Sequence, residues 1–375
     1  MRIFIAPDKF KGSLTGKQAA EAIAKGLKTI FPDAQYHLLP LADGGEGLLD
    51  AFEQTGSCEH HEALVGDAMD REVTAAWLMM TDGTEKTAII ESSQANGLWR
   101  VSEEERNPSR ATSYGVGQLI REAIQKGAKS IVIGIGGSAT NDLGIGIAAA
   151  LGCKFLNEAG ENLEPLPANF QEITRIDTSG MVKLPPITVA CDVANPLLGT
   201  RGATQVYGPQ KGIAPEDLAA AESAHSQLAS VVNAHFKTDF TEYPGVGAAG
   251  GIGYGLMTFC GATLESGFEC IAHALQAEQH LAKADMVFTA EGSIDSQTLE
   301  GKTPFGVSLL AHKHRIPIYA LAGKIADESL LQQHFDGLTS IVNSPMTLEY
   351  AIEHAAELLE LAASRLAHTI KNSRR

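Results

Sequence analysis

The sequence predicts an α/β protein built from two domains. Both ends of the chain alternate short apolar runs with amphipathic stretches, a pattern typical of strands and helices around a parallel sheet. The region that starts near Cys58 contains strand-like runs separated by short turns instead. With 375 residues, the chain is long enough for two or three domains. We therefore expect an open, mostly parallel, Rossmann- or flavodoxin-like sheet (1–60 plus 285–375). A second, mixed α/β domain (61–284) is expected to interrupt it, with the active site in the cleft between them.

The first sixty residues are expected to alternate two strands with two helices. The apolar run at residues 3–6 predicts a buried strand, and residues 36–39 predict a second one. Between them, Thr15 is placed to cap a helix, and Gln18 follows three residues later as its capping-box partner. Polar residues follow both strands, and ligands of open α/β sheets bind at that edge.

The middle of the chain is expected to combine an antiparallel meander with further α/β units. Asn107, with Pro108 behind it, predicts the start of a helix that ends at Gly127. The run at residues 131–133 has the length and β-branched content of a buried strand. The meander is predicted from the strand-like residues 62–65, 72–80 and 87–90.

The rest of the chain continues this alternation. A loop is expected at residues 198–212 and a helix at 216–236, and the last helix carries an apolar stripe from Leu348 to Leu366. That apolar stripe is also compatible with a homodimer. Strands are predicted at residues 187–190, 285–289, 316–321 and 339–342.

Composition excludes some classes of partner and compartment. The formal net charge of −16 argues against nucleic acid and anionic membranes as main partners, although a small anionic ligand needs only a local basic pocket. The five cysteines are widely spaced and form no C-x-x-C motif, so neither a disulfide framework nor structural zinc is expected. The N-terminal apolar run is too short for a signal peptide. We expect a cytoplasmic protein with reduced thiols.

The stretch around which the chain is organised is residues 131–152, IVIGIGGSATNDLGIGIAAALG. It predicts a strand, a glycine turn and a helix, an arrangement that binds anions through unpaired backbone N–H groups. Ser138, Thr140 and Asn141 can donate to the same anion or cap the helix. Asp142 adds a carboxylate, which favours Mg²⁺ between it and a phosphate. An ordinary capped turn explains the same residues equally well.

Two glycine patterns suggest a dinucleotide site, but neither is convincing. Residues 245–250 match G-x-G-x-x-G, yet no buried strand precedes them. Residues 134–139 match G-x-G-x-x-A after a strand, but the strand that should follow, at 153–156, is short. A nicotinamide-dependent oxidoreductase of a small hydroxy acid therefore remains an alternative, as does a non-catalytic ligand sensor.

Acidic residues recur at the predicted strand ends, with basic residues near several of them. Each one alone is explained by a helix cap or a solvated turn. Together they describe a polar cleft with metal-binding carboxylates and phosphate-binding cations, which is the combination that phosphoryl transfer needs. The acids are Asp8, Asp43, Asp142, Asp192, Glu291 and Asp295, and the bases are Lys9, Lys11, Arg201, Lys211, Lys302 and Lys324.

Several of these stretches also resemble one known family. The stretches APDKFKGSLT, LADGGEG, GIGGSATND, CDVANPL and EGSIDSQTLEGKTP, together with the loop around Gly245, are similar to the bacterial class I glycerate kinase family in order and spacing. The resemblance runs from Met1 to the terminal helix. It implies ATP-dependent phosphorylation of D-glycerate on a two-domain α/β fold, with Mg²⁺ as the expected cofactor.

We assign roles to individual residues from their chemistry and their places in the sequence. Asp192 is predicted to accept the proton of the substrate hydroxyl, because it follows a buried strand at the ligand-binding edge, and Lys11 is predicted to act in catalysis as well. The predicted ATP and phosphate ligands are Gly136, Gly137, Ser138, Thr140 and Lys302. The predicted substrate ligands are Lys9, Ser13, Asn195 and Arg201, and the predicted metal ligands are Asp43, Asp142, Glu291 and Asp295. The favoured product is 2-phosphoglycerate, with 3-phosphoglycerate as the other possibility.

Overall fold

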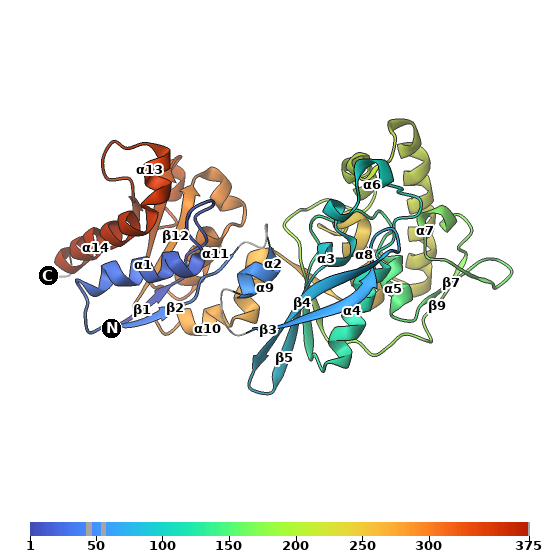
Figure 1. Ribbon diagram of the computed structural model, residues 1–375, viewed down its shortest axis with the longest axis horizontal. Coiled ribbons are helices and arrows are strands. Elements are labelled where there is room, and N and C mark those ends of the chain that lie inside the picture. Colours follow the sequence, from blue (N-terminus) through green and yellow to red (C-terminus); the bar gives the residue numbers. More distant parts are fainter. Residues whose placement is uncertain (43–46, 54–57, 374–375) are drawn as a thin grey trace. The chain divides into compact units, whose positions relative to one another are not determined.

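A computed structural model of the chain describes residues 1–42, 47–53 and 58–373 (Figure 1). The chain folds into two compact units. Unit 1 comprises Met1–Glu46, Asp50–Gly56 and Ser266–Arg375, and unit 2 comprises Gly47–Leu49 and Ser57–Glu265. Residues 266–284 thus belong with the terminal segments, whereas the limits predicted from the sequence put them in the insertion.

Unit 1 is built on a parallel sheet of five strands in the order β14-β13-β12-β1-β2. Numbered along unit 1, this is the order 2-1-3-4-5 of flavodoxin-like sheets, one of the two sheet types that the sequence left open. The order reverses between β1 and β12, and such a reversal opens a crevice at the carboxyl ends of the two strands. The strands are β1 (Arg2–Ile5), β2 (Gln35–Leu38), β12 (Met286–Ile294), β13 (Ile318–Ile325) and β14 (Gly337–Ser340).

Helices cover both faces of this sheet. On one face, α1 (Gly16–Lys28) and α14 (Ala355–Ser373) pack against each other and bury Ile3, Ile5 and Phe288. The predicted capping box of α1 is confirmed, because the Thr15 side chain accepts from the backbone of Gln18 and the Gln18 side chain accepts from the backbone of Thr15. On the other face, α11 (Thr303–Lys313) contacts β12 and β13.

The remaining helices of this part of the chain are short. Those of unit 1 are α9 (Gly267–Ala274), α10 (Ala277–Leu281), α12 (Glu328–Leu331), α13 (Leu348–Glu353) and a 3₁₀ turn, Ser296–Glu300. The helix α2 (Leu48–Glu53) lies where the chain passes from unit 1 to unit 2.

Unit 2 is built on a mixed sheet of six strands in the order β11-β10-β6-β5-β4-β3. The predicted meander is confirmed, since β4 pairs antiparallel with both β3 and β5. The four strands from β5 to β11 in this order pair parallel, so their carboxyl ends lie along one edge. The strands are β3 (Cys58–Gly66), β4 (Glu72–Asp82), β5 (Glu85–Glu91), β6 (Ser130–Gly134), β10 (Ile187–Ala190) and β11 (Thr263–Glu265).

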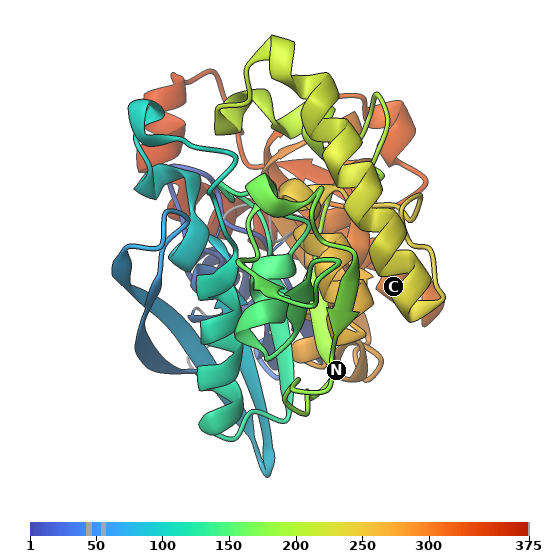
Figure 2. The same ribbon diagram turned by 90° about the vertical axis from the view of Figure 1, so that its right-hand side faces the viewer.

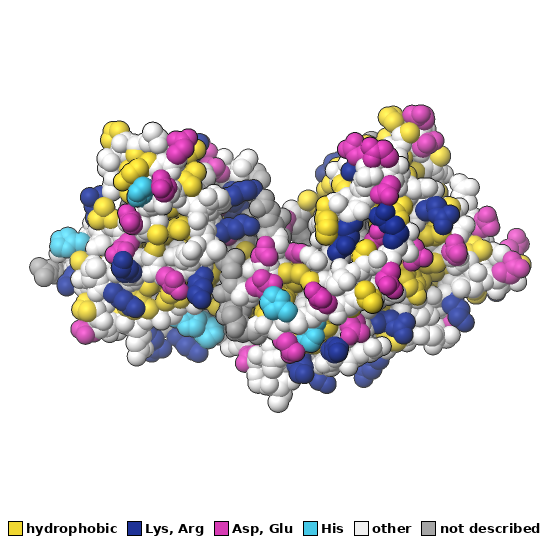
Figure 3. All heavy atoms as spheres, in the orientation of Figure 1, with side chains coloured by type: hydrophobic (Ala, Val, Ile, Leu, Met, Phe, Trp, Pro, Cys, Tyr) yellow, Lys and Arg dark blue, Asp and Glu magenta, His cyan; other side chains and the backbone are white. Residues whose placement is uncertain are grey.

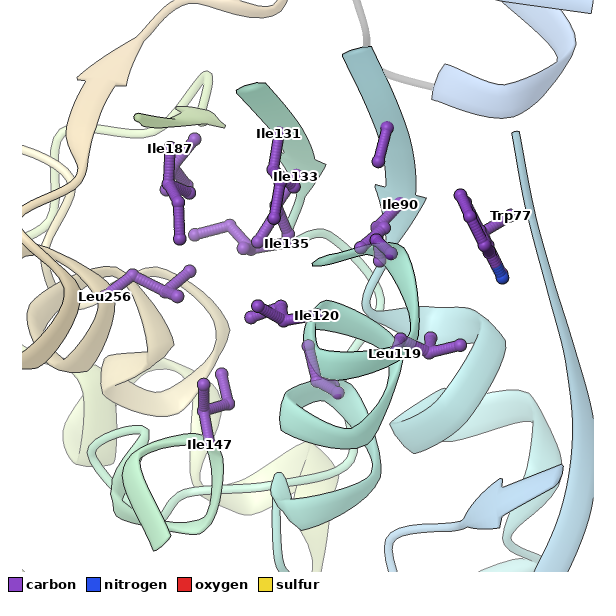
Figure 4. Close-up of a cluster of buried hydrophobic side chains, with 14 of the residues drawn as sticks. Trp77, Ile90, Leu119, Ile120, Ile131, Ile133, Ile135, Ile147, Ile187 and Leu256 are labelled. Carbon is purple, nitrogen blue, oxygen red and sulfur yellow. The ribbon is translucent and has the colours of Figure 1, made fainter. Parts of the chain in front are cut away.

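One face of this sheet is covered by α4 (Tyr114–Gln125), α5 (Ile145–Ala150) and α8 (Ala248–Cys260). Figure 4 shows the core that they enclose: Ile131 and Ile133 of β6 point toward Leu119 and Ile120 of α4, with Leu256 of α8 beside them. Alternation along β6 therefore fixes which residues meet the helices.

A second core of unit 2 lies behind these helices. There α7 (Leu218–Phe236), which runs along the surface in Figure 2, packs with the small antiparallel sheet β8-β7-β9. The other elements are β7 (Lys154–Leu156), β8 (Asn162–Leu163), β9 (Arg175–Asp177), α3 (Ser93–Asn96), α6 (Ala203–Tyr207), and 3₁₀ turns at Leu98–Arg100, Glu103–Glu105, Pro167–Asn169, Pro209–Lys211 and Pro215–Asp217.

Two predicted boundaries in unit 2 are wrong. The helix expected from Asn107 begins only at Tyr114, because the Asn107 side chain accepts from the backbone and hydroxyl of Ser109 and so closes a local turn. Residues 198–212, expected to be a loop, contain α6 and a 3₁₀ turn. Among the described residues, no helix combines the length and apolarity that a membrane span requires.

Candidate active site

The glycine turn after β6 presents backbone N–H groups. Gly136 and Gly137 are exposed, and Gly137 has a φ of 71°, in the left-handed region. The carbonyl of Gly137 accepts from Leu98 N, but within the described residues the N–H groups of Gly136, Gly137 and Ser138 donate to no protein acceptor. Successive N–H groups left unpaired in such a turn form a concavity that binds anions.

The helix N-terminus that the sequence placed at this turn lies elsewhere. α5 begins only at Ile145, so the predicted coincidence of strand, glycines and helix start is wrong. The physical reason is Asp142, whose carboxylate accepts from the backbone and hydroxyl of Ser113 and from Gly144 N and thereby shapes the intervening residues into a turn. Asp142 is fully buried, and burial raises its pKa against the opposing effect of these hydrogen bonds.

A buried lysine lies beneath the turn. Lys211 is 2% exposed, and its Nζ donates to Ser138 Oγ at 3.1 Å and to the Thr140 carbonyl at 2.6 Å. Burial lowers the pKa of Lys211 to about 7, against the attraction of Asp142. Asn96 Nδ2 donates to Thr140 Oγ1 at 3.1 Å, so the predicted phosphate ligands Ser138 and Thr140 are both held from below.

The loop after β10 carries the residues predicted to act on the substrate. Asp192 and Arg201 are exposed. Asn195 fixes the loop, because its Nδ2 donates to the Arg201 carbonyl at 2.8 Å and its Oδ1 accepts from the Tyr207 hydroxyl at 2.7 Å. Both polar atoms of the Asn195 side chain thus contact the protein, and the residue orients the loop.

The glycine-rich stretch at 245–255 packs backbone against backbone. A Cβ added to Gly247 would lie 2.0 Å from the Pro196 carbonyl, and one added to Gly250 would lie 2.0 Å from the Thr140 carbonyl. Ala249, Gly250 and Gly251 all have positive φ, which lets this segment lie directly on the two functional loops. The glycines therefore serve close packing.

In unit 1, polar residues gather where β1 and β12 end, at the reversal of strand order. Asp8 follows β1 and is buried; its carboxylate accepts from Thr303 Oγ1 at 2.6 Å and from Lys9 N at 2.6 Å. Near the end of β12, Glu291 forms an ion pair with Lys302 Nζ at 3.2 Å. A predicted metal ligand and a predicted phosphate ligand therefore lie in contact.

The comparisons with known proteins agree with one another over nearly the whole chain. A family model described as "Glycerate kinase family" matches residues 3–371. The chain belongs to this family. The Bacillus subtilis glycerate kinase is 42% identical over 99% of this chain and 98% of its own length. The Escherichia coli glycerate 2-kinase is 41% identical with the same coverage.

A solved structure supports the same assignment. A crystal structure from Salmonella typhimurium LT2, described as a candidate glycerate kinase 2, superposes with a TM-score of 0.86 and 39% identity over 100% of this chain and 99% of that chain. Membership of the glycerate kinase family makes the chain an enzyme of the phosphotransferase class, as the resemblance of its motifs predicted. The roles of individual residues stay predictions.

The other predicted residues of this kinase lie at the same strand ends. Lys9 is half-buried and Lys11 exposed, and the backbone of Phe10 and Lys11 runs beside Gly292. Ser13 Oγ donates to the Ile352 carbonyl at 2.6 Å. Asp43 lies outside the described residues. Figure 3 shows acidic and basic side chains interspersed over the face that it displays.

Mg²⁺ fits the acids of unit 1 better than it fits Asp142. Mg²⁺ binds through one or two carboxylates together with waters and substrate phosphates, so a dense ligand cluster is not required. In the part of the chain that the structure describes, no three His, Cys, Asp or Glu residues are grouped to hold a metal. Glu291 and Asp295 are half-exposed at the end of β12 and would hold the ion, although Asp295 also caps the following 3₁₀ turn through Gln297 N.

Sequence reasoning missed the place of three polar residues of unit 2. Lys211 was expected only to help hold the substrate near Asp192, and neither Asn96 nor His225 was singled out. His225 is buried and its Nε2 contacts the Asn141 carbonyl at 2.8 Å, while burial lowers its pKa. No local pattern marks these residues, because each reaches the turn from a distant segment.

The contact between Thr303 and Asp8 is expected to stabilise unit 1. Replacing Thr303 by Val removes the hydroxyl that donates to a buried carboxylate, so unit 1 should lose about 1–3 kcal/mol of stability. Hydrogen exchange of the α11 amides measures this loss. Thr303→Ser keeps the donor and serves as the control; equal exchange in the Val and Ser variants would contradict the assignment.

Proposed function

We propose that the chain catalyses the ATP- and Mg²⁺-dependent phosphorylation of D-glycerate, with 2-phosphoglycerate as the favoured product and 3-phosphoglycerate as the alternative. Family membership supports the reaction. The observation that carries the site assignment is the turn at residues 136–138, whose N–H groups find no protein acceptor among the described residues. The cytoplasm is the expected compartment, on composition and cysteine spacing.

The proposed division of roles follows the chemistry of each group. The glycine turn holds phosphate oxygens of ATP, and Lys302 adds a cation. Lys9, Lys11 and Arg201 are candidates for holding the carboxylate of glycerate. Asp192 takes the proton of the attacking hydroxyl late in the transfer. When bound, Mg²⁺ neutralises phosphate charge, and Glu291 and Asp295 are the residues that would hold it.

A coupled assay of ADP release tests the reaction. The purified protein is supplied with ATP, Mg²⁺ and, in turn, D-glycerate, L-glycerate and other small hydroxy acids. We expect turnover with D-glycerate that a chelator abolishes. Phosphorus NMR then identifies the product, because a phosphate on the secondary carbon couples to one proton and a phosphate on the primary carbon couples to two. Absence of turnover with every hydroxy acid would contradict the proposal.

The two alternatives have less support. A nicotinamide site at residues 134–139 requires a helix that starts at the glycines, whereas α5 starts at Ile145. Binding of NAD in the presence of chelator would support the nicotinamide site instead. A ligand sensor would bind ATP or glycerate without turnover above background, and the same coupled assay separates it from the kinase.

A substitution at Gly136 tests the phosphate turn. No atom lies within 4 Å of a Cβ built at this residue, so Gly136→Val should fold normally while its side chain blocks approach to the N–H groups. We expect ATP affinity to fall by about tenfold or more, roughly 1.4 kcal/mol. Isothermal titration measures this affinity. A urea midpoint equal to that of wild type shows that the variant folds. Gly137 is a poorer choice, because its φ of 71° would strain any β-branched residue.

A further inference from the structure

The position of Lys211 is unusual for a lysine. It is 2% exposed, and no carboxylate of the described residues lies within ion-pair distance of its ammonium group. Its two acceptors, Ser138 Oγ and the Thr140 carbonyl, are both neutral. Lysines are almost never fully buried unless they are paired with an opposite charge. Within the described residues no carboxylate therefore contacts this cation directly, and Asp142 attracts it only from beyond ion-pair distance.

The hydrogen bonds around Lys211 fix the direction in which Ser138 can donate. An ammonium group has three N–H donors and no acceptor, so Ser138 Oγ must accept from it. The hydroxyl proton of Ser138 then has to point away from Lys211. Ser138 also belongs to the turn whose backbone N–H groups have no protein acceptor in the described residues. The serine hydroxyl, polarised by a charge behind it, thus becomes a further donor for the same anion.

Two buried amide side chains also lie near this cluster. Asn96 is fully buried and Asn141 is 1% exposed, yet the Oδ1 atoms of both have no hydrogen-bond partner among the described residues. Their Nδ2 atoms donate to Thr140 and Thr204, respectively. These oxygens are acceptors, so a water or another donor would complete them, and the anion itself would not. Both amides lie next to the turn in the hydrogen-bond network.

We propose that Lys211 is the positioning residue and counter-cation of an oxyanion subsite formed by the backbone of Gly136, Gly137 and Ser138 and by the Ser138 hydroxyl. The ligand class is a phosphate or phosphoryl group. This inference deepens the proposed function and rests on it, since it assumes that the turn holds nucleotide phosphates. Lys211 acts through Ser138 and Thr140 and through its charge. Burial lowers the pKa of Lys211 despite the attraction of Asp142, and a bound phosphate would add a further opposite charge.

Lys211→Met tests the inference, because methionine keeps the apolar stem and removes the charge. We expect affinity for ADP and ATP to fall by at least about tenfold. Adenosine, which has no phosphate, should bind the variant within about twofold of wild type, since only the oxyanion contact is lost. In turnover, KM for ATP should rise while KM for D-glycerate stays unchanged. Lys183→Met, at an exposed lysine of unit 2, is the matched control and should leave all five quantities unchanged.

The outcomes separate the possible failures. Unchanged ADP affinity in folded Lys211→Met overturns the inference, and so does an equal loss for adenosine and ADP, which would indicate a merely structural role. If Lys211→Met does not fold, Ser138→Ala decides: we expect ADP affinity to fall by about threefold or more, and an unchanged affinity again overturns the inference. The proposed function is judged separately by glycerate-dependent ADP release from the wild-type enzyme.

Discussion

Asp192→Asn should lower kcat by about 100-fold or more while ATP affinity holds. Asparagine keeps the size and hydrogen-bonding capacity of the side chain but cannot accept a proton. Asp192 is exposed just beyond β10, at the edge where the parallel strands of unit 2 end, and ligands of such sheets bind at that edge. The loop that presents it is fixed by Asn195, which contacts both Arg201 and Tyr207. A carboxylate carried by a fixed loop can serve as a general base.

The measurement is steady-state kinetics with ATP and D-glycerate, with Mg²⁺ varied. Asp217→Asn removes another exposed acid of the same unit, one to which no role in the site is assigned, and it should leave kcat unchanged. If kcat of Asp192→Asn equals that of wild type, the base lies elsewhere, with Asp295 the next candidate. If instead the concentration of Mg²⁺ needed for half-maximal activity rises steeply, Asp192 is a metal ligand.

Gly250→Ala should destabilise unit 2 by more than about 3 kcal/mol or prevent its folding. The added Cβ would lie 2.0 Å from the Thr140 carbonyl and 2.7 Å from Asn141 Cα, both of them backbone atoms that cannot rotate away. The φ of 72° adds the strain of a left-handed conformation. Because the Thr140 carbonyl also accepts from Lys211, any shift that relieves the clash should disturb the glycine turn as well.

Gly199→Ala separates the clash from the backbone strain. Gly199 has a φ of 84° with no atom within 4 Å of an added Cβ, so only the left-handed strain of about 1–2 kcal/mol applies. Both tryptophans of the chain, Trp77 and Trp99, lie in unit 2, and their fluorescence during urea unfolding reports this unit alone. Equal urea midpoints for the two variants would show that the backbone at 249–251 shifts to accommodate an added Cβ, and they would contradict the expected clash.

Elements that depend on neighbours in the sequence were predicted from the sequence. The capping box of Thr15 and Gln18 needs only residues three apart, and the buried strand at 131–133 only a run of apolar residues. The meander of unit 2 follows from alternation interrupted by short turns. The order of strands in unit 1 is compatible with such patterns, but only hydrogen bonding between distant segments decides it. The family resemblance depended on blocks of contiguous residues, and the comparisons bear it out.

The tertiary structure decided where side chains from distant segments meet. Local preference favoured a helix start at Asn107 and another at the glycine turn, but the Asn107 side chain closes a turn of its own and Asp142 bonds to Ser113 instead. Lys211 reaches Thr140 across 71 residues of sequence, and Thr303 reaches Asp8 across 295. Such contacts carry no periodic signal, because the geometry of the folded sheets brings their partners together. The sequence alone determined the fold class and the polar strand ends; only the folded chain placed a buried cation beneath the phosphate turn.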